Sequence, residues 1–304
     1  MITIYYRTIK DKKIRRLKRI KRWAWVNVVD PTEREIKYLR ELGVGVSFIE
    51  DALDPDELPR IEIENGTIYV MLNVPQEDRG KVLNVPLLVI ITKDIFITLS
   101  KKHLDCLKLV LSRKDIYTTQ KTKNLLQICL QTTELYTKET RIINKKIVAK
   151  KVTLSKLKNK DIVALIGLEE ALSEFITSLV SLIGIFEKIL SGKYVKVFEA
   201  DQELLEDLII DSQQSLDMCK TSIKKIVNIR EAYSTILTNN LNKVMKILAV
   251  LTLIMGIHEV IVGFYGMNVR LPMEQNPLAF FYIFILLFAL SLILVLIFYL
   301  KKWL

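Results

Sequence analysis

A long uncharged segment near the end of the chain constrains the fold more than any other feature. No Asp, Glu, Lys, Arg or His occurs from Leu278 to Leu300. A helix needs about 20 apolar residues to cross a bilayer, and this segment meets that length. An earlier apolar segment, from about 247 to 264, is interrupted by His258 and Glu259 and is a weaker candidate. We therefore predict two transmembrane helices, joined by an external loop over 265–277.

The charged residues lie almost entirely before these segments. The chain has 304 residues, 26% of them charged, and a formal net charge of +11. Lys243 and Lys246 precede the first apolar segment, and Lys301 and Lys302 follow the second. By the positive-inside rule, both termini are then cytoplasmic. The opening residues lack the apolar core of a signal peptide, so we expect a large cytoplasmic part and a small multi-pass part in the cell membrane.

A basic run, Arg7–Arg22, carries ten Lys or Arg residues and a single acid, Asp11. Such a run can bind nucleic acid or anionic lipid. It has few aromatic residues and no nucleic-acid motif, which favours a solvated or lipid-facing surface over a nucleic-acid partner. A membrane-tethered scaffold that binds through this surface is the alternative from another class of protein.

No pattern in the sequence predicts an enzyme. There is no catalytic constellation, and there is no glycine-rich phosphate-binding loop of the kind that an ATP-driven pump needs. Cys106, Cys129 and Cys219 are odd in number and lack the spacing of metal ligands. We predict that they are reduced, partly buried thiols.

Residues 1–117 carry the signals of an α/β domain. Asn65-Gly66, between two alternating segments, predicts a hairpin. Further strands are predicted on both sides of Lys93-Asp94. In "DPTERE", Asp30 is predicted to cap a helix, with Glu33 in capping-box spacing.

Residues 118–242 have no proline and only three glycines, which predicts long helices. The last of these helices has no break before the membrane. Extending from about 195 to 264, it would be about 100 Å long. The third part, 243–304, holds the two predicted spans.

Within the first span, five residues recur every three or four positions and so share one helix face. They are Leu248, Thr252, Gly256, Glu259 and Gly263. A carboxylate in mid-membrane costs roughly 2.5–3.5 kcal/mol, so Glu259 is expected to face water or a partner.

The segment "YGMN", Tyr265–Asn268, follows a long charged helix and precedes a last apolar helix that ends in "KKWL". This arrangement resembles the CorA magnesium transporters. The stretch "NNLNKVMKILAVLT" is similar to the family's stalk-to-membrane junction. The stretches "WVNVVDPTEREIKYL" and "FIEDALDPDELPRIEIENGTIYVML" are similar to the start of its cytoplasmic domain. The resemblance covers nearly the whole chain and is weakest from about 118 to 195.

The resemblance implies a funnel-shaped homopentamer with an α/β N-terminal cytoplasmic domain, a long α-helical stalk and a two-helix transmembrane domain. Its activity would be channel-like Mg²⁺ uptake. The pore mouth would be formed by Tyr265, Gly266, Met267 and Asn268. Asn268 would contribute a ring of five amides, which suits Mg²⁺ because this ion gives up its water reluctantly.

The same resemblance places the shared helix face of the first span on the pore. Leu248 would form a hydrophobic constriction and Thr252 a polar ring. Glu259 departs from the family's usual threonine and would form an ion-binding ring. His258 is expected to pack against a neighbour. Beside a carboxylate it also suits Co²⁺, Ni²⁺ or Zn²⁺, so a transporter of those ions is the alternative within the family.

The resemblance also implies that intracellular Mg²⁺ bridges neighbouring subunits and closes the pore. Glu50 and Asp51 in "FIEDAL", and Glu231 in "REAYST", fit the family's regulatory acids. Asp207 is a further candidate, as a partner of Glu50. A basic ring at the inner mouth would be made by Lys246, Lys301 and Lys302.

Overall fold

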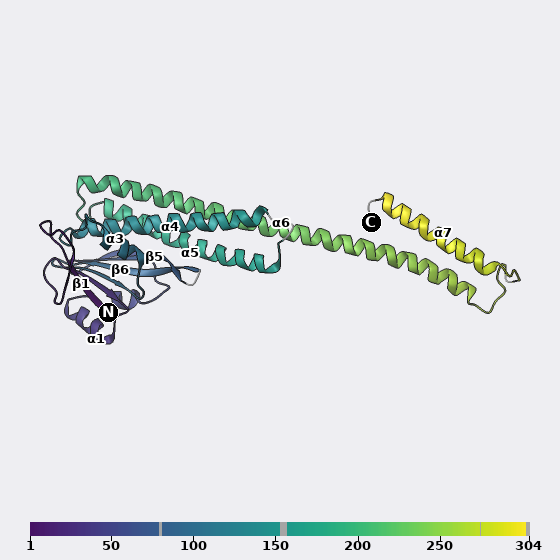
Figure 1. Cartoon of the computed structure of the whole chain (residues 1–304), viewed down its shortest axis with the longest axis horizontal. Coiled ribbons are helices and arrows are strands. Elements are labelled where there is room, and N and C mark those ends of the chain that lie inside the picture. The colour runs from purple at the N-terminus through teal and green to yellow at the C-terminus, as the bar shows by residue number, and fades with distance from the viewer. Residues whose placement is uncertain (79–80, 153–156, 274, 302–304) are drawn as a thin grey trace. The chain divides into compact units, whose positions relative to one another are not determined.

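A computed structural model describes residues 1–78, 81–152, 157–273 and 275–301. It divides into two compact units, Met1–Ile229 and Arg230–Leu304. The strands are β1 (Ile2–Tyr6), β2 (Arg15–Leu17), β3 (Trp25–Val29), β4 (Arg60–Glu64), β5 (Thr67–Asp78), β6 (Lys81–Ile91) and β7 (Phe96–Ser100). The helices are α1 (Glu33–Glu41), α2 (Val46–Asp51), α3 (Asp105–Ser112), α4 (Lys121–Val152), α5 (Asn159–Leu190), α6 (Glu199–Tyr265) and α7 (Ala279–Leu300) (Figure 1).

One sheet forms the centre of the first unit. Its strand order is β2-β1-β3-β7-β6-β5-β4. Strands β3 and β7 pair in parallel, and the other neighbouring strands pair antiparallel. Asn65 and Gly66 have φ of 49° and 78°, which is the left-handed backbone that a two-residue hairpin turn requires. The predicted hairpin is confirmed.

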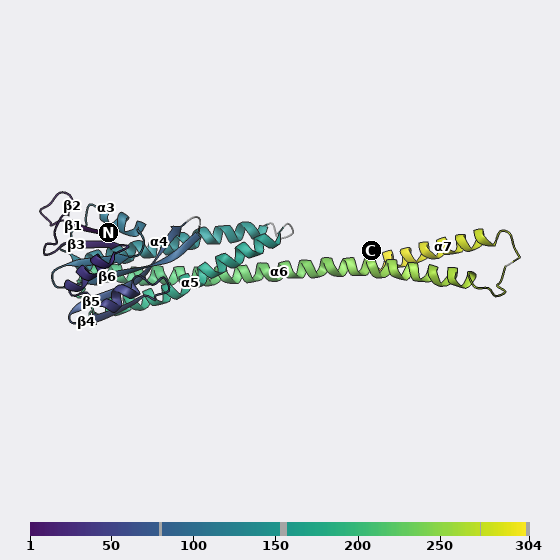
Figure 2. The ribbon, with the colours of Figure 1, turned by 90° about the horizontal axis from the view of Figure 1, so that it is seen from below.

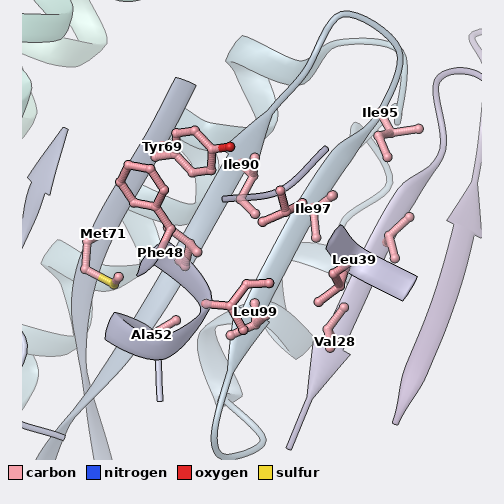
Figure 3. Close-up of a cluster of buried hydrophobic side chains, with 14 residues drawn as sticks. Val28, Leu39, Phe48, Ala52, Tyr69, Met71, Ile90, Ile95, Ile97 and Leu99 are labelled. Carbon is pink, nitrogen blue, oxygen red and sulfur yellow. The ribbon is translucent and has the colours of Figure 1, made fainter. Parts of the chain in front are cut away.

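Helices α1 and α2 cover one face of this sheet, and the core lies between them (Figure 3). The Phe48 ring of α2 stacks on the Tyr69 ring of β5, with centroids 3.8 Å apart. The Tyr69 hydroxyl accepts a hydrogen bond from the Gly45 N–H at 3.2 Å, just before α2 begins. Helix α2, which carries two of the predicted regulatory acids, is therefore fixed by the sheet.

The predicted cap of α1 is wrong. The N-cap is Thr32, which forms a capping box with Glu35, and the helix begins at Glu33. Asp30 has φ of 46°, outside the extended region that an N-cap adopts, and its N–H still donates to the Ser100 carbonyl. The sequence holds two overlapping capping-box spacings, and spacing alone could not distinguish them.

Helices α4 and α5 pack against the opposite face of the sheet. Trp25 lies on this face with its ring 5.0 Å from that of Phe96, and its Nε1–H donates to Thr98 Oγ1. The three cysteines are free and buried in this unit. Burial raises the pKa of Cys106 and of Cys129 to about 12.

The predicted long helix is confirmed, because α6 is continuous over 67 residues. Both α6 and α7 are long and apolar enough to cross a membrane, by length and composition. Within the second unit, α7 runs back beside the end of α6 (Figures 1 and 2). The division into parts 1–117, 118–242 and 243–304 stays a prediction.

Candidate functional site

The last turns of α6 have two different faces in the second unit. One face contacts α7 through His258, whose Nε2 lies 3.0 Å from Ser291 Oγ. Positions one or two turns away on this face, Val250, Ile254 and Ile261, are buried or half-buried. Repeats of three and four residues explain why these positions share a face.

Both ring nitrogens of His258 have partners. Nδ1 lies 2.7 Å from the Ile254 carbonyl oxygen. A carbonyl only accepts, so Nδ1 carries a proton, and Nε2 faces the Ser291 hydroxyl. The Ser291 hydroxyl also reaches the Leu287 carbonyl at 2.8 Å. Both ring nitrogens therefore lie against groups of α6 and α7, and the imidazole is held against α7.

The predicted pore stripe lies on the other face of α6. Leu248 is 54% exposed, and Thr252, Glu259 and Gly263 are also exposed, with Gly256 half-buried. Glu259 forms no ion pair among the residues that the structure describes. Residues on opposite sides of a helix cannot face the same neighbour. The chain's own α7 therefore leaves this stripe uncovered.

The "YGMN" segment ends α6. Tyr265 is the last helical residue, and the Gly266 N–H donates to the Val262 carbonyl at 3.0 Å. A Cβ at Gly266 would lie 3.5 Å from the Val262 and Gly263 carbonyl oxygens, which is ordinary contact. The chain itself thus leaves room for a side chain at Gly266. Met267 and Asn268 follow as exposed residues of the loop.

The predicted regulatory acids are spread over two helices. Glu50 and Asp51 lie at the end of α2, and Asp207 and Glu231 lie on α6. Glu50, Asp207 and Glu231 are exposed. In the described part of the chain, no group of three or more His, Cys, Asp or Glu residues is arranged to hold a metal ion. One copy of the chain therefore does not bring these acids into a complete site.

Asp51 already has a cationic partner. Its Oδ2 lies 2.5 Å from Arg60 Nη2. The Arg60 guanidinium also pairs with Glu57 and Glu62, so one cation serves three carboxylates. A metal ion at Asp51 would have to displace this arginine. Sequence reasoning missed Arg60, although "DELPRIEIE" shows it as the one base among acids.

Sequence reasoning also missed Ser291. It is the only serine in the otherwise apolar α7, and a lone hydroxyl in such a helix is a signal for an interhelical hydrogen bond. The partner could not be predicted, because the register of α7 against α6 depends on the loop geometry.

The basic residues fall into two groups. Lys246 and Lys301 are exposed in the second unit, and Lys302 lies outside the described residues. Within the basic run, Arg7 is buried, and its guanidinium donates to the Ile116 carbonyl at 3.3 Å. The other bases of the run are exposed around β2, an edge strand of the sheet. Charged side chains on an edge strand prevent it from pairing with strands of other chains. The basic run can have this protective role without binding any ligand.

The structure thus combines a large α/β unit with two helices long and apolar enough to span a membrane, and α7 leaves one face of α6 uncovered. A sequence profile of the CorA-like Mg²⁺ transporter protein family matches residues 21–302, and the chain belongs to this family. The resemblance noted in the sequence is confirmed. The family is one of transporters, so divalent cations are what the chain carries across the membrane.

Individual relatives agree with this assignment. The cobalt/magnesium transport protein CorA of Methanocaldococcus jannaschii is 25% identical, over 93% of this chain and 92% of the relative. The complete structure of the CorA magnesium transporter from the same organism has a TM-score of 0.88 at 22% identity, covering 100% of this chain and 99% of that one. The full-length CmaX protein has a TM-score of 0.73 at 16% identity, covering 99% and 97%. At these identities the two structures support the fold alone.

Proposed function

We propose that the chain forms a homopentameric, channel-like transporter that mediates Mg²⁺ uptake. One observation carries the proposal. The polar stripe of α6 that includes Thr252 and Glu259 is uncovered, while His258 on the other face is tied to α7. A carboxylate in mid-membrane needs water or a partner, and a pore shared by several copies supplies both. Five copies of α6, each with α7 outside it, would line such a pore.

The mouth of this pore would select by hydration. Asn268 is exposed immediately after α6, and five neutral amides can accept hydrogen bonds from a hydrated ion without holding it tightly. The structure leaves room for a Cβ at Gly266, so a strict need for glycine there would come from the ion or from neighbouring copies. Membrane potential suffices to drive entry, since a divalent ion gains about 4.6 kcal/mol per 100 mV, inside negative.

Intracellular Mg²⁺ would close the channel. Glu50, Asp51, Asp207 and Glu231 are incomplete as a metal site in one copy, which fits sites completed by a neighbour. Carboxylates at an interface repel one another when empty and attract a shared divalent ion when it is present. The Asp51–Arg60 ion pair would hold the empty site in a stable form. Lys246, Lys301 and Lys302 would surround the inner exit.

Co²⁺ is the second candidate cargo, since the relative from Methanocaldococcus jannaschii is named a cobalt/magnesium transport protein. Preference for Ni²⁺ or Zn²⁺ would need a nitrogen ligand in the pore. His258 lies against Ser291 of α7 and not on the stripe, so the stripe offers no nitrogen ligand and Mg²⁺ is favoured. Glu259 is then the one ionisable residue of the stripe that faces the ion.

Mg²⁺ entry into proteoliposomes, followed with an internal indicator dye, tests the proposal. Wild type is expected to take up Mg²⁺, and Asn268→Ala is expected to lose most of that uptake. Gln275→Ala is the matched control, because it removes an exposed amide from the same loop. If neither wild type nor the control took up Mg²⁺, and neither took up Co²⁺, the proposal of transport would be refuted. Equal uptake by wild type and Asn268→Ala would move selectivity down to Glu259.

A further inference from the structure

A cavity of about 310 Å³ lies in the first unit, and none of the predicted regulatory acids lines it. The loop after α2, strands β5 and β6, and helix α5 enclose it. Its lining consists of Pro55, Asp56, Glu57, Leu58, Asn73, Leu83, Asn84, Glu174, Thr177 and Ser178. Three of these described residues are acidic and none is basic.

Two of the acids lack counter-ions. The Glu57 carboxylate pairs with Arg60 outside the cavity. Asp56 and Glu174 form no ion pair among the described residues. The two carboxylates lie close enough to interact, and both side chains are exposed to solvent. Negative charge thus accumulates here without compensation from the chain.

A buried acceptor in the same cavity is also unsatisfied. Asn73 is only 6% exposed. Its Nδ2 donates to the Glu57 carbonyl at 3.0 Å and to Ser178 Oγ at 3.4 Å, which fixes the orientation of the amide. Its Oδ1 has no hydrogen-bond partner. A buried acceptor without a donor is costly and calls for a ligand that can donate.

The hydrogen bonds around Asn73 involve its main-chain carbonyl, Tyr136, Asn84 and Ser178. Its main-chain carbonyl stands opposite Pro86, which has no N–H, and accepts instead from the Tyr136 hydroxyl at 2.9 Å. The same hydroxyl lies 3.1 Å from Asn84 Oδ1, and Asn84 Nδ2 donates to Ser178 Oγ at 3.1 Å. Among the side-chain atoms of this network, Asn73 Oδ1 is the one without a hydrogen-bond partner.

We propose that this cavity binds a partly hydrated divalent cation within a single subunit, with the carboxylates of Asp56 and Glu174 as ligands and Asn73 Oδ1 accepting from a metal-bound water. Mg²⁺ suits such a site, because it is commonly held by one or two carboxylates and keeps several waters. Its waters are the donors that Asn73 lacks. A bound cation would join α5 to the loop that follows Asp51.

Binding of Mn²⁺, counted by electron paramagnetic resonance on the full chain in detergent, tests this site. We expect the double variant Asp56→Asn, Glu174→Gln to bind one Mn²⁺ per chain fewer than wild type. The control, Glu170→Gln, removes a carboxylate one helical turn away that does not line the cavity, and it is expected to bind as wild type does. An unchanged count in the double variant overturns the proposal, as does an equal loss in the control.

Hydrogen exchange on the wild-type chain gives an independent measurement that needs no variant. Mg²⁺ is expected to slow amide exchange in the 55–58 loop and in the segment 174–178 of α5. Exchange that Mg²⁺ leaves unchanged in both segments would overturn the site. Neither measurement depends on ion transport. The site can therefore be tested even if the chain proves not to transport Mg²⁺.

Discussion

The two units of the chain differ in how they cover their apolar side chains. In Met1–Ile229, strand β7 and the longer part of β5 and of β6 are buried, and helices pack on both faces of the sheet. Among the described apolar residues of Arg230–Leu304, only Val250 and Leu287 are buried. The first unit contains its own core. The apolar side chains of the second unit are exposed, and under the proposed assembly lipid and other copies of the chain would cover them.

Ionisable groups follow the same division. In the first unit, Arg60 binds three carboxylates. In the second unit, Glu259 is exposed and has no ion pair among the described residues. A group that the fold neutralises serves stability, whereas one left without a partner points to a ligand from outside the chain. In the first unit, Asp56 and Glu174 at the acidic cavity likewise form no ion pair with a described residue.

The largest expected effect comes from a matched pair of Phe→Ala substitutions. Phe96 is fully buried beside Trp25, so Phe96→Ala should lower the free energy of unfolding by about 3–5 kcal/mol. Phe284 is 61% exposed, so Phe284→Ala should change it by less than about 0.5 kcal/mol. Denaturant unfolding of the full chain in detergent, followed by tryptophan fluorescence and circular dichroism, measures both. A large loss at Phe284 would instead show that another copy covers it.

The comparison also explains which features the sequence could predict. Local signals sufficed for the Asn65-Gly66 hairpin and for the unbroken α6, because turn chemistry and the absence of breakers act within a few residues. They misplaced the cap of α1, where Asp30 and Thr32 both fit the spacing. The deciding factor was the backbone of Asp30, which remains hydrogen-bonded to β7.

The candidate site divides in a similar way. The stripe from Leu248 to Gly263 is a repeat within one helix, and it was readable from the sequence. The His258–Ser291 contact joins residues 33 positions apart, and the Asp51–Arg60 pair depends on how β4 lies beside α2. The cavity at Asn73 combines a loop, two strands and a helix. Such contacts depend on tertiary structure, which residue spacing does not encode.

The second prediction concerns Glu259, where stability and function should oppose each other. Glu259→Leu should favour membrane insertion of the helix by about 3 kcal/mol, because it replaces a mid-membrane carboxylate with an apolar side chain. The same change should lower Mg²⁺ uptake by removing the charged ring. A translocon insertion assay and the proteoliposome flux assay measure the two effects. Uptake equal to wild type would show that Glu259 faces another helix rather than the ion.

The third prediction isolates the hydrogen bond between His258 of α6 and Ser291 of α7. A double-mutant cycle of His258→Ala and Ser291→Ala should give a coupling energy of about 0.6 kcal/mol, and at most about 1.7 kcal/mol, as for other interhelical hydrogen bonds in membranes. Leu292→Ala is the control partner, since Leu292 is 63% exposed. Its cycle with His258→Ala should give no coupling. Equal coupling in both cycles would mean that His258 acts through packing.

The smallest expected effect tests whether Arg60 competes with the regulatory ion. Under the proposed gating, Mg²⁺ must displace the Arg60 guanidinium from Asp51 before it can bind there. The pair is about one-third exposed, and such ion pairs contribute about 0.2–1 kcal/mol. Arg60→Gln removes the competitor and leaves its acids unneutralised. The internal Mg²⁺ concentration that half-inhibits uptake should therefore fall, by about fivefold at most.

Arg40→Gln is the matched control for this last experiment, because Arg40 is exposed at the end of α1 and forms no ion pair with a described residue. It lowers the net charge of the chain by the same amount. An equal shift in both variants would mean that general electrostatics sets the inhibitory concentration. A shift confined to Arg60→Gln would mean that Arg60 occupies Asp51 when Mg²⁺ is absent. Mg²⁺ would then have to displace the guanidinium before it could close the channel.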